Sequence, residues 1–221
     1  PSPDGKWLAF LEERTTLKAI NLETKETKVL LPGEKNYSYS DGDIAFRWSP
    51  DSQWIAAEYY PFEQWITEIA VIQVATGQVH NVSLSGYNDG SPQWSADGKQ
   101  LLWLSDRNGL RSHGGHGSQA DVYAVYLAKA DHDKYTRPES ELEDETPPDK
   151  DKDKEKKDGD KAEAAKEEKK EEKKKVVVAI DFEGLRDRVR RLTLNSSVGM
   201  NYALAPDGKT LVYFANSAGK F

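Results

Sequence analysis

The sequence predicts an all-β fold: a partial β-propeller of four-stranded antiparallel blades, interrupted by a long charged, disordered insertion. A short turn motif recurs at a blade-length interval. Apolar runs of strand length follow each copy of this motif. Outside the insertion, no segment repeats apolar residues at helical spacing over three turns, which argues against a helical fold.

The turn motif has the pattern Ser-Pro-Asp-Gly-Lys, with single departures. Its aspartates, spaced by 47, 46 and 110 residues, are Asp4, Asp51, Asp97 and Asp207. Proline presets the backbone, the aspartate accepts from amides two residues on, and glycine takes a positive φ, so each copy is expected to join two antiparallel strands. Ser52 replaces the glycine of the second copy and Ala96 the proline of the third, which leaves the local turn geometry open.

Strand-length runs follow the motif in a regular order. The run directly after each turn covers residues 7–10, 54–57, 101–104 and 211–214. A further run covers residues 17–22, 68–74 and 121–127. A fourth strand is expected at residues 27–31, 79–84 and 189–194.

This order predicts the division of the chain. Blades are expected at residues 1–45, 46–90 and 91–131; the charged low-complexity insertion at 132–175 interrupts the third blade, which ends at 176–200, and the next blade starts at 201–221. Propellers typically need four to eight blades of about 45 residues. We therefore expect the complete ring to need more chain than these residues supply.

The insertion is compositionally distinct from the blades. It holds 14 basic and 17 acidic residues but only five apolar ones. Such a segment cannot bury enough apolar surface to offset its ordering entropy, although residues 161–166 have high helix propensity and allow a transient solvated helix. Two interpretations stay open: a charged arm that docks a partner, or a tolerated loop extension on the propeller rim.

Composition excludes several classes of function. The net charge of −7 argues against a nucleic-acid partner. The absence of cysteine excludes disulfides, thiolate metal sites and cysteine nucleophiles, but does not identify the compartment. No apolar run is long enough for a membrane span, and no leader segment is recognisable at the start of the chain.

The sequence predicts no catalytic, cofactor-binding or metal-binding residue. His113 and His116 lie three residues apart with Asp121 nearby, so a metal site is an alternative, but the glycines between them leave both rings unfixed. Ser118 beside His116 lacks a positioned oxyanion hole, and no Gly-x-Ser-x-Gly elbow occurs. A polar, partner-facing loop is the favoured interpretation.

Aromatic residues divide into two groups. The tryptophans at repeat-equivalent positions, namely Trp7, Trp48, Trp54, Trp94 and Trp103, are expected to pack between blades. Tyr60 and Trp65 lie instead in a connection between strands, where the alternatives are local packing and contact with a ligand or a neighbouring domain. The predicted peptide or partner contacts are Tyr60, Trp65, Arg107, Arg111, His113 and His116.

The blade motif resembles the WD-like propellers of prolyl-oligopeptidase relatives, of the Tol-system propeller protein and of tricorn-type serine peptidases. A longer order of segments is more specific than the blade motif alone. It consists of residues 104–109 (Leu-Ser-Asp-Arg-Asn-Gly), an elongated loop, the strand at 121–127, the charged insertion and residues 180–188. This order resembles the second propeller of bacterial tricorn-type serine peptidases over essentially the whole chain.

The resemblance implies a noncatalytic propeller domain that guides peptides to a catalytic core outside this segment. The implied partners are peptide substrates and the parent chain's other propeller, PDZ-like and catalytic domains; a homo-oligomer is compatible with it. It favours the periplasm and leaves the cytoplasm open. No catalytic residue of the family has a counterpart here. The alternative is a Tol-type scaffold propeller for protein interaction, with no peptidase attached.

Overall fold

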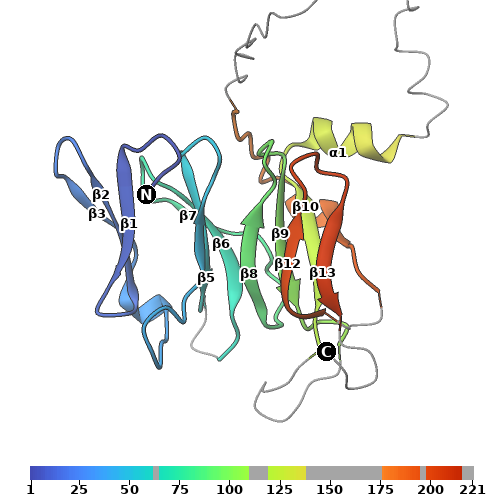
Figure 1. Ribbon diagram of the computed structural model, residues 1–221, viewed down its shortest axis with the longest axis horizontal. Helices are drawn as coiled ribbons and strands as arrows, with labels where there is room; N and C mark the ends of the chain where they lie inside the picture. Colours follow the sequence, from blue (N-terminus) through green and yellow to red (C-terminus); the bar gives the residue numbers. More distant parts are fainter. Residues whose placement is uncertain (62–64, 110–118, 138–175, 195–197, 216–221) are drawn as a thin grey trace, which may run out of the picture.

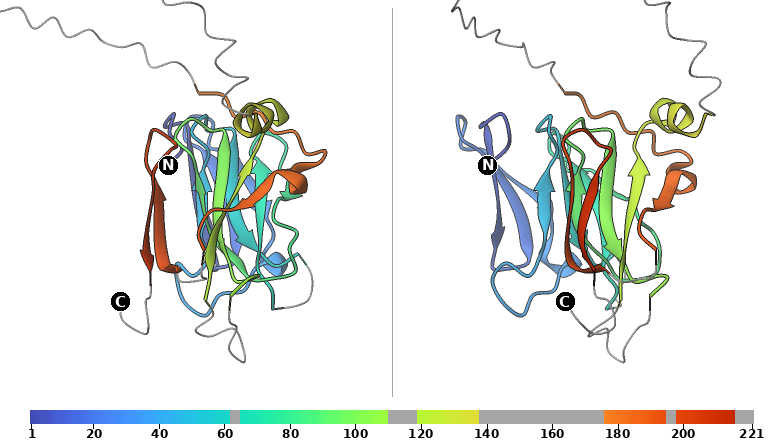
Figure 2. Two further views of the ribbon diagram at one scale, coloured as in Figure 1. Left: turned by 90° about the vertical axis from the view of Figure 1, so that its right-hand side faces the viewer. Right: turned by 45° about the vertical axis from the view of Figure 1, so that its right-hand side comes forward.

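Four antiparallel sheets stand side by side in chain order (Figures 1 and 2). The computed structural model describes residues 1–61, 65–109, 119–137, 176–194 and 198–215. The first sheet has three strands, the second and third have four, and the fourth has two. The predicted all-β fold of four-stranded propeller-type sheets is confirmed.

The first and second sheets come from continuous stretches of chain. The first contains β1 (Trp7–Glu12), β2 (Thr16–Asn21) and β3 (Thr27–Leu31), and a short 3-10 helix, η1 (Gly33–Lys35), follows it. The second contains β4 (Phe46–Trp48), β5 (Trp54–Tyr59), β6 (Glu68–Gln73) and β7 (Val79–Asn81). Neighbours in sequence are neighbours in the sheet, as expected for a meander.

The third sheet is interrupted in sequence and the fourth is short. The third contains β8 (Asp89–Trp94), β9 (Gln100–Ser105), β10 (Asp121–Tyr126) and, after helices α1 (Lys129–Thr136) and η3 (Leu185–Arg188), strand β11 (Val189–Arg191). The fourth contains β12 (Val198–Leu204) and β13 (Leu211–Ala215). β11 pairs with β10 despite the long separation in sequence.

The hydrophobic core consists of layers between neighbouring sheets, because alternate residues of a strand point to opposite faces. In β5, Ile55 and Ala57 pack against the first sheet and Ala56 packs against the third. In β9, Trp103 packs against the second sheet and Leu102 against the fourth. Burial on both faces explains why these strands have uninterrupted apolar sequences. The repeat-equivalent tryptophans lie in these layers, as predicted.

The turn motifs share one hydrogen-bond pattern. In the first three copies, a buried serine donates to the turn aspartate at 2.6 Å. The same hydroxyl accepts from the amide five residues on, at 2.9 or 3.0 Å. All four aspartates accept from the amide two residues on, as predicted. Ser52 adopts φ +63°, close to the +71° of Gly98, so the turn keeps its shape without glycine.

The fourth strand of the second sheet is shorter than predicted. The sequence predicts a strand over residues 79–84, but β7 ends at Asn81. The hydroxyl of Ser83 donates to the Glu68 carboxylate at 2.7 Å and accepts from the Ile69 amide at 2.9 Å. Because the Ser83 side chain, and not the backbone, accepts from the Ile69 amide at this point, β7 ends earlier than predicted.

The third sheet repeats this device. The strand predicted over residues 189–194 ends at Arg191. Thr193 donates to Asp121 at 2.8 Å and accepts from the Val122 amide at 2.9 Å. Glu68 and Asp121 both open the third strand of their sheets. They are therefore structural acids of the repeat, and Asp121 is not free for the metal that we considered beside His113 and His116.

Helix α1 overlaps the start of the predicted insertion at residue 132 and was not predicted. It has no buried residue. The Lys129 amide donates to Asp181 at 2.8 Å, Lys99 Nζ lies 2.6 Å from the Asp131 carboxylate, and the rings of Tyr135 and Tyr126 have centroids 5.0 Å apart. A helix without buried residues shows no apolar periodicity to detect. Residues 138–175, which carry most of the predicted insertion and its predicted disorder, lie outside the described residues.

The chain after the insertion closes the core between the second and third sheets. Leu185 is buried there. The guanidinium of Arg188, a residue only 4% exposed, donates to the carbonyls of Tyr126, Leu127, Asp181 and Glu183. A buried charge with four carbonyl partners is well compensated.

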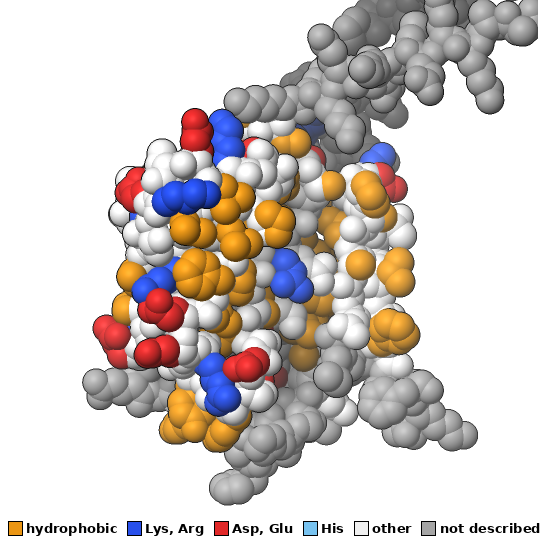
Figure 3. All heavy atoms as spheres, turned by 60° about the vertical axis from the view of Figure 1, so that its left-hand side comes forward, with side chains coloured by type: hydrophobic (Ala, Val, Ile, Leu, Met, Phe, Trp, Pro, Cys, Tyr) orange, Lys and Arg blue, Asp and Glu red, His pale blue; other side chains and the backbone are white. Residues whose placement is uncertain are grey.

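The outward face of the first sheet is exposed (Figure 3). Apolar side chains gather on it, and Leu8 and Val29 are 39% and 54% exposed. Val212 and Phe214, on the fourth sheet at the other end of the row, are 63% and 71% exposed. The described sheets form an open row, whose two outermost faces lack the neighbour that covers every inner face.

Candidate functional site

Connections between strands alternate between two ends of the sheets. The turn end carries the four motif turns and α1, at the top of Figure 1. The loop end carries the connections at residues 13–15, 32–45, 60–67, 82–88, 106–120 and 192–197. Among the described residues, the predicted contacts Tyr60, Trp65 and Arg107 all lie at the loop end. Arg111, His113 and His116 lie outside the described residues.

A pocket of about 240 Å³ opens at the loop end. Two connections and the end of β5 form it. Its lining residues are Asn36, Tyr37, Tyr39, Asp43, Ile44, Glu58, Tyr60, Trp65 and Thr67. The structure therefore brings predicted residues Tyr60 and Trp65 together, and adds a segment around Tyr37 and Tyr39 that the sequence analysis did not single out.

Aromatic rings form a corner of the pocket. The rings of Tyr37 and Trp65 have centroids 4.4 Å apart and planes at 72°. Those of Tyr37 and Tyr39 are 4.7 Å apart at 79°. Edge-to-face contacts of this kind hold the rings at fixed angles. Tyr39 and Trp65 nevertheless remain 77% and 67% exposed, so the cluster is open to a ligand.

Two carboxylates line the same pocket. Burial raises the pKa of Glu58, while the Ser91 amide, which donates at 2.5 Å, opposes this shift. Hydrogen bonds from the Ser40 side chain and amide, and from the Tyr39 amide, lower the pKa of Asp43. Burial, followed by the charge of Glu58, raises the pKa of Tyr60. The pocket is therefore lined by two carboxyl groups, and hydrogen bonds favour the charged form of Asp43.

Asp43 also has a structural role. Its carboxylate accepts from the Tyr39 and Ser40 amides at 2.7 Å and from the Ser40 hydroxyl at 2.7 Å. These bonds fix the loop that presents Tyr37 and Tyr39. A short polar side chain that closes its own loop in this way is common in turns. Glu58 differs, because it lies at the end of a strand and needs no loop to position it.

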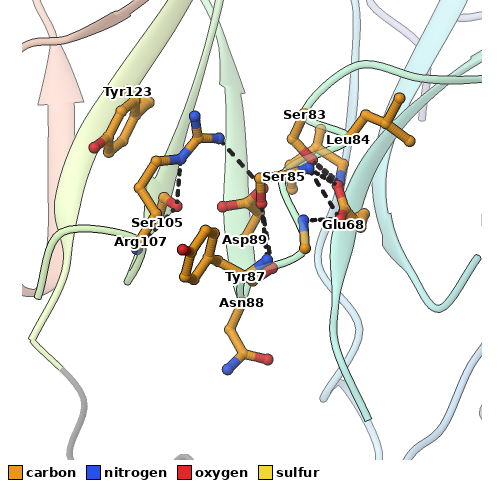
Figure 4. A network of polar contacts seen from close by, with 12 residues as sticks. Glu68, Ser83, Leu84, Ser85, Tyr87, Asn88, Asp89, Ser105, Arg107 and Tyr123 are labelled. Carbon is orange, nitrogen blue, oxygen red and sulfur yellow. Dashed lines mark hydrogen bonds and ion pairs between the residues drawn. The ribbon is translucent and has the colours of Figure 1, made fainter. Parts of the chain in front are cut away.

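Arg107 turns back into the protein instead of outward (Figure 4). Its Nε lies 3.4 Å from the Ser105 hydroxyl, and its guanidinium carbon lies 4.6 Å from the centre of the Tyr123 ring. A terminal nitrogen is 4.0 Å from the carboxylate of Asp89. Arg107 is thus positioned by three neighbours at the loop end.

Asp89 lies between Arg107 and the hydrogen bonds that Glu68 accepts from Ser83, Ser85 and Gly86. It is fully buried, and burial raises its pKa, opposed by hydrogen bonds that include one from Ser85 at 2.6 Å. The Ser85 and Gly86 amides donate in turn to Glu68, at 2.8 and 2.7 Å. Figure 4 shows this continuous polar network beneath the connection at residues 82–88. The network gives the loop end a rigid base.

The sequence analysis missed Tyr37, Tyr39, Asp43 and Glu58. One signal was available: the connection from Leu31 to Phe46 is long and holds two tyrosines among serines and aspartates. Its approach to residues 60–67 depends on the pairing of β4 with β5. That pairing places two connections, far apart in sequence, beside each other.

The described part of the chain holds no group of three histidine, aspartate or glutamate side chains suited to a metal ion. His113 and His116 lie outside it, so the expectation of no metal there stays a prediction. Within the described residues, no helix has the length and apolar character needed to cross a membrane.

No protein-family model and no curated protein matches the chain. Among solved structures, it is similar to the tricorn protease over 88% of its own length, with 14% identity and a TM-score of 0.49. It is also similar to a putative TolB from Agrobacterium tumefaciens, over 57% of its length with 20% identity and a TM-score of 0.40. A third match is TolB from Acinetobacter baumannii, over 58% of its length with 21% identity and a TM-score of 0.40.

These matches cover 16%, 43% and 29% of the respective chains, so this chain spans less than half of each. They assign no residue a role. The row of antiparallel sheets, with layered cores between them, defines the architecture by itself. The chain is a β-propeller-type domain.

Proposed function

We propose that this chain is a noncatalytic propeller domain of a tricorn-type serine peptidase. It binds peptide segments at its loop end and guides them to a catalytic core outside these residues. The observation that carries the proposal is the open aromatic pocket between residues 36–44 and 58–67. Its position matches the connection that the sequence analysis selected for peptide contact.

The physical basis is the division between a rigid base and an exposed rim. The Glu68 and Asp89 network holds the loop end from below. Exposed Tyr39 and Trp65 present apolar area that costs little entropy to order on binding, since aromatic side chains have few rotatable bonds. Binding residues in proteins commonly lie on loops that a rigid scaffold positions.

The family assignment is supported by the order of motifs along the sequence: the blade motif, residues 104–109, the elongated loop and the charged insertion. In this proposal, the partners are peptide substrates and the parent chain's other propeller, PDZ-like and catalytic domains. The boundaries at residues 45, 90, 131, 175 and 200 are proposed as the limits of its blades and insertion.

The test compares short and long fluorogenic peptides on the longer protein that the proposal requires. The change Trp65→Leu should lower kcat/KM on long peptides about 10-fold and leave a very short substrate unaffected, because only long peptides reach the pocket. Tyr135→Leu, which removes an exposed aromatic side chain at the turn end, is the matched control. Equal losses on both lengths would contradict a guiding role.

A second arm separates the alternative. The 221-residue chain alone should hydrolyse no peptide, and turnover by it would overturn the noncatalytic assignment. Peptide binding at the loop end without serine-peptidase activity in the longer protein would favour the Tol-type scaffold instead.

A further inference from the structure

The pocket at the loop end has the composition of a cation-binding site. Four aromatic residues line it: Tyr37 and Tyr39 from the connection before β4, and Tyr60 and Trp65 from the connection after β5. Aromatic faces attract ammonium and guanidinium groups through the ring quadrupole, and tryptophan and tyrosine are the strongest such rings. The perpendicular arrangement of Tyr37 against Tyr39 and Trp65 forms a corner, whereas stacked rings would cover one another.

Charge complements the rings. Glu58 and Asp43 both line the pocket, and no lysine or arginine does among the described residues. Neither carboxylate forms an ion pair within the part of the chain that the structure describes. The pocket therefore offers negative charge without a positive group of its own.

Nearby basic side chains are engaged elsewhere. Lys35 Nζ donates to the Pro61 carbonyl at 3.2 Å. Arg14 binds Asp41 at 2.8 Å and the Tyr39 carbonyl at 3.4 Å. Arg47 acts on Glu58 only as a more distant charge. These contacts fix the loops around the pocket and leave its centre to a ligand.

We propose that this pocket binds the cationic side chain, lysine or arginine, of an extended peptide. The inference rests on the proposed function in one respect only, namely that the ligand is a peptide. An acidic side chain would meet two carboxylates. An apolar one would bury the Glu58 carboxylate further without supplying an opposite charge, which is costly. A basic side chain satisfies both the rings and the charges.

The state of Glu58 agrees with this occupant. Its carboxyl pKa is raised by burial and only partly restored by the Ser91 amide and Arg47. A cation in the pocket would supply the missing compensation. Glu58 Oε1 lies directly against β8 of the third sheet, where it accepts from the Ser91 amide and where a Cβ on Gly90 would come within 2.8 Å of it, so this strand holds the carboxylate in place.

The experiment measures binding of two pentapeptides to the 221-residue chain by NMR, following the Trp65 indole N–H. The peptides are acetyl-Gly-Ala-Lys-Ala-Gly-amide and its norleucine counterpart, which keeps the length of the side chain and lacks the charge. The lysine peptide should bind about 10-fold more tightly than the norleucine peptide. This difference is within the range expected for an ammonium group that contacts both aromatic rings and a carboxylate.

Variants separate the pocket from the rest of the surface. Trp65→Leu should weaken binding of the lysine peptide about 5-fold or more. Because this variant lacks the indole, its binding is followed through the amide signal of Thr67. Trp65→Phe should retain most of the affinity because it keeps a ring. Tyr135→Leu should change nothing. Circular dichroism confirms that each variant is folded, as expected for positions that are 67% and 56% exposed.

Each outcome bears on one of the two proposals. Equal affinity for both peptides, lost in Trp65→Leu, would overturn the cation preference but keep peptide binding at the loop end. Binding that Trp65→Leu leaves unchanged, or no binding, would overturn both. A lysine preference in a protein without peptidase activity would keep the inference and remove the peptidase assignment.

Discussion

At the turn end, a serine, an aspartate and two backbone amides meet in the same geometry three times, whereas the described loop-end connections share only the hydroxyl-to-acid contacts of Ser83 with Glu68 and Thr193 with Asp121. The repeated turn needs only six consecutive residues, so each copy of the motif can form it locally. The loop end assembles residues from separate connections instead. One end therefore defines the repeat, and the other is free to differ from blade to blade.

Carboxyl groups show the same contrast. At the turn end, burial tends to raise the pKa of Asp4, but hydrogen bonds from Ser2 and the Lys6 amide outweigh it and lower the value. At the loop end, burial prevails and raises the pKa of Glu58 and of Asp89. Asp43 is the exception, because its own loop surrounds it with donors. Burial thus prevails at two carboxyl groups of the loop end, of which Glu58 lines the pocket.

The largest effect is expected from Glu68→Ala, which tests whether the base of the loop end is structural. The change leaves the buried Ser83 hydroxyl and the amides of Ser85 and Gly86 without the acceptor that the buried Glu68 carboxylate provides, and should lower the free energy of unfolding by about 3 kcal/mol. Urea denaturation measures it. Thr16→Ala, at the equivalent position of β2, is the control and should cost less than about 1 kcal/mol. Equal losses would show that the network adds nothing.

Ser49→Ala tests the repeated turn. Ser49 is fully buried and bridges Asp51 and the Trp54 amide. Its loss should cost about 1–2 kcal/mol, since a buried amide loses its partner. The same denaturation assay applies, with Ser38→Ala, an exposed serine at the loop end, as control. A cost no greater than that of the control would remove the turn from the elements that define the repeat.

Ala205→Ser sharpens the comparison by completing the fourth motif. Ala205 occupies the serine position, and its amide already donates to the Thr210 carbonyl at 2.8 Å, as Ser2 does to Trp7. A hydroxyl there should reach Asp207 and the Thr210 amide and raise the free energy of unfolding by about 0.5–1 kcal/mol. A loss of stability in denaturation would mean that this turn differs from the other three.

Glu58→Gln tests the loop end through pH. A carboxyl whose folded pKa is raised stabilises the protein most below its ordinary pKa, and that contribution is lost as pH rises through the folded value. Glutamine does not titrate and still offers an acceptor to the Ser91 amide. The variant's melting temperature relative to the parent should therefore increase as pH rises above the ordinary glutamate pKa, and level once pH exceeds the raised folded value. A constant difference would contradict the burial of this charge.

Sequence reasoning recovered the turn end and the strands but not the pocket. Asp4 and Ser2 interact within five residues, so their pattern is visible in a single window of sequence. Tyr37 and Trp65 meet only because two connections converge, and Glu58 resembles any other strand residue until its neighbours are placed. Helix α1 was missed because it buries no residue, so its sequence shows no apolar periodicity.

The central claim is that ligands bind at the loop end and not at the turn end. Hydrogen–deuterium exchange of the 221-residue chain, with and without the lysine pentapeptide at saturating concentration, tests it most directly. Exchange should slow in residues 36–44, 58–60 and 65–67, which include the lining of the pocket, and stay unchanged in the four motif turns and α1. Slower exchange at the turn end, with no change around the pocket, would contradict the account.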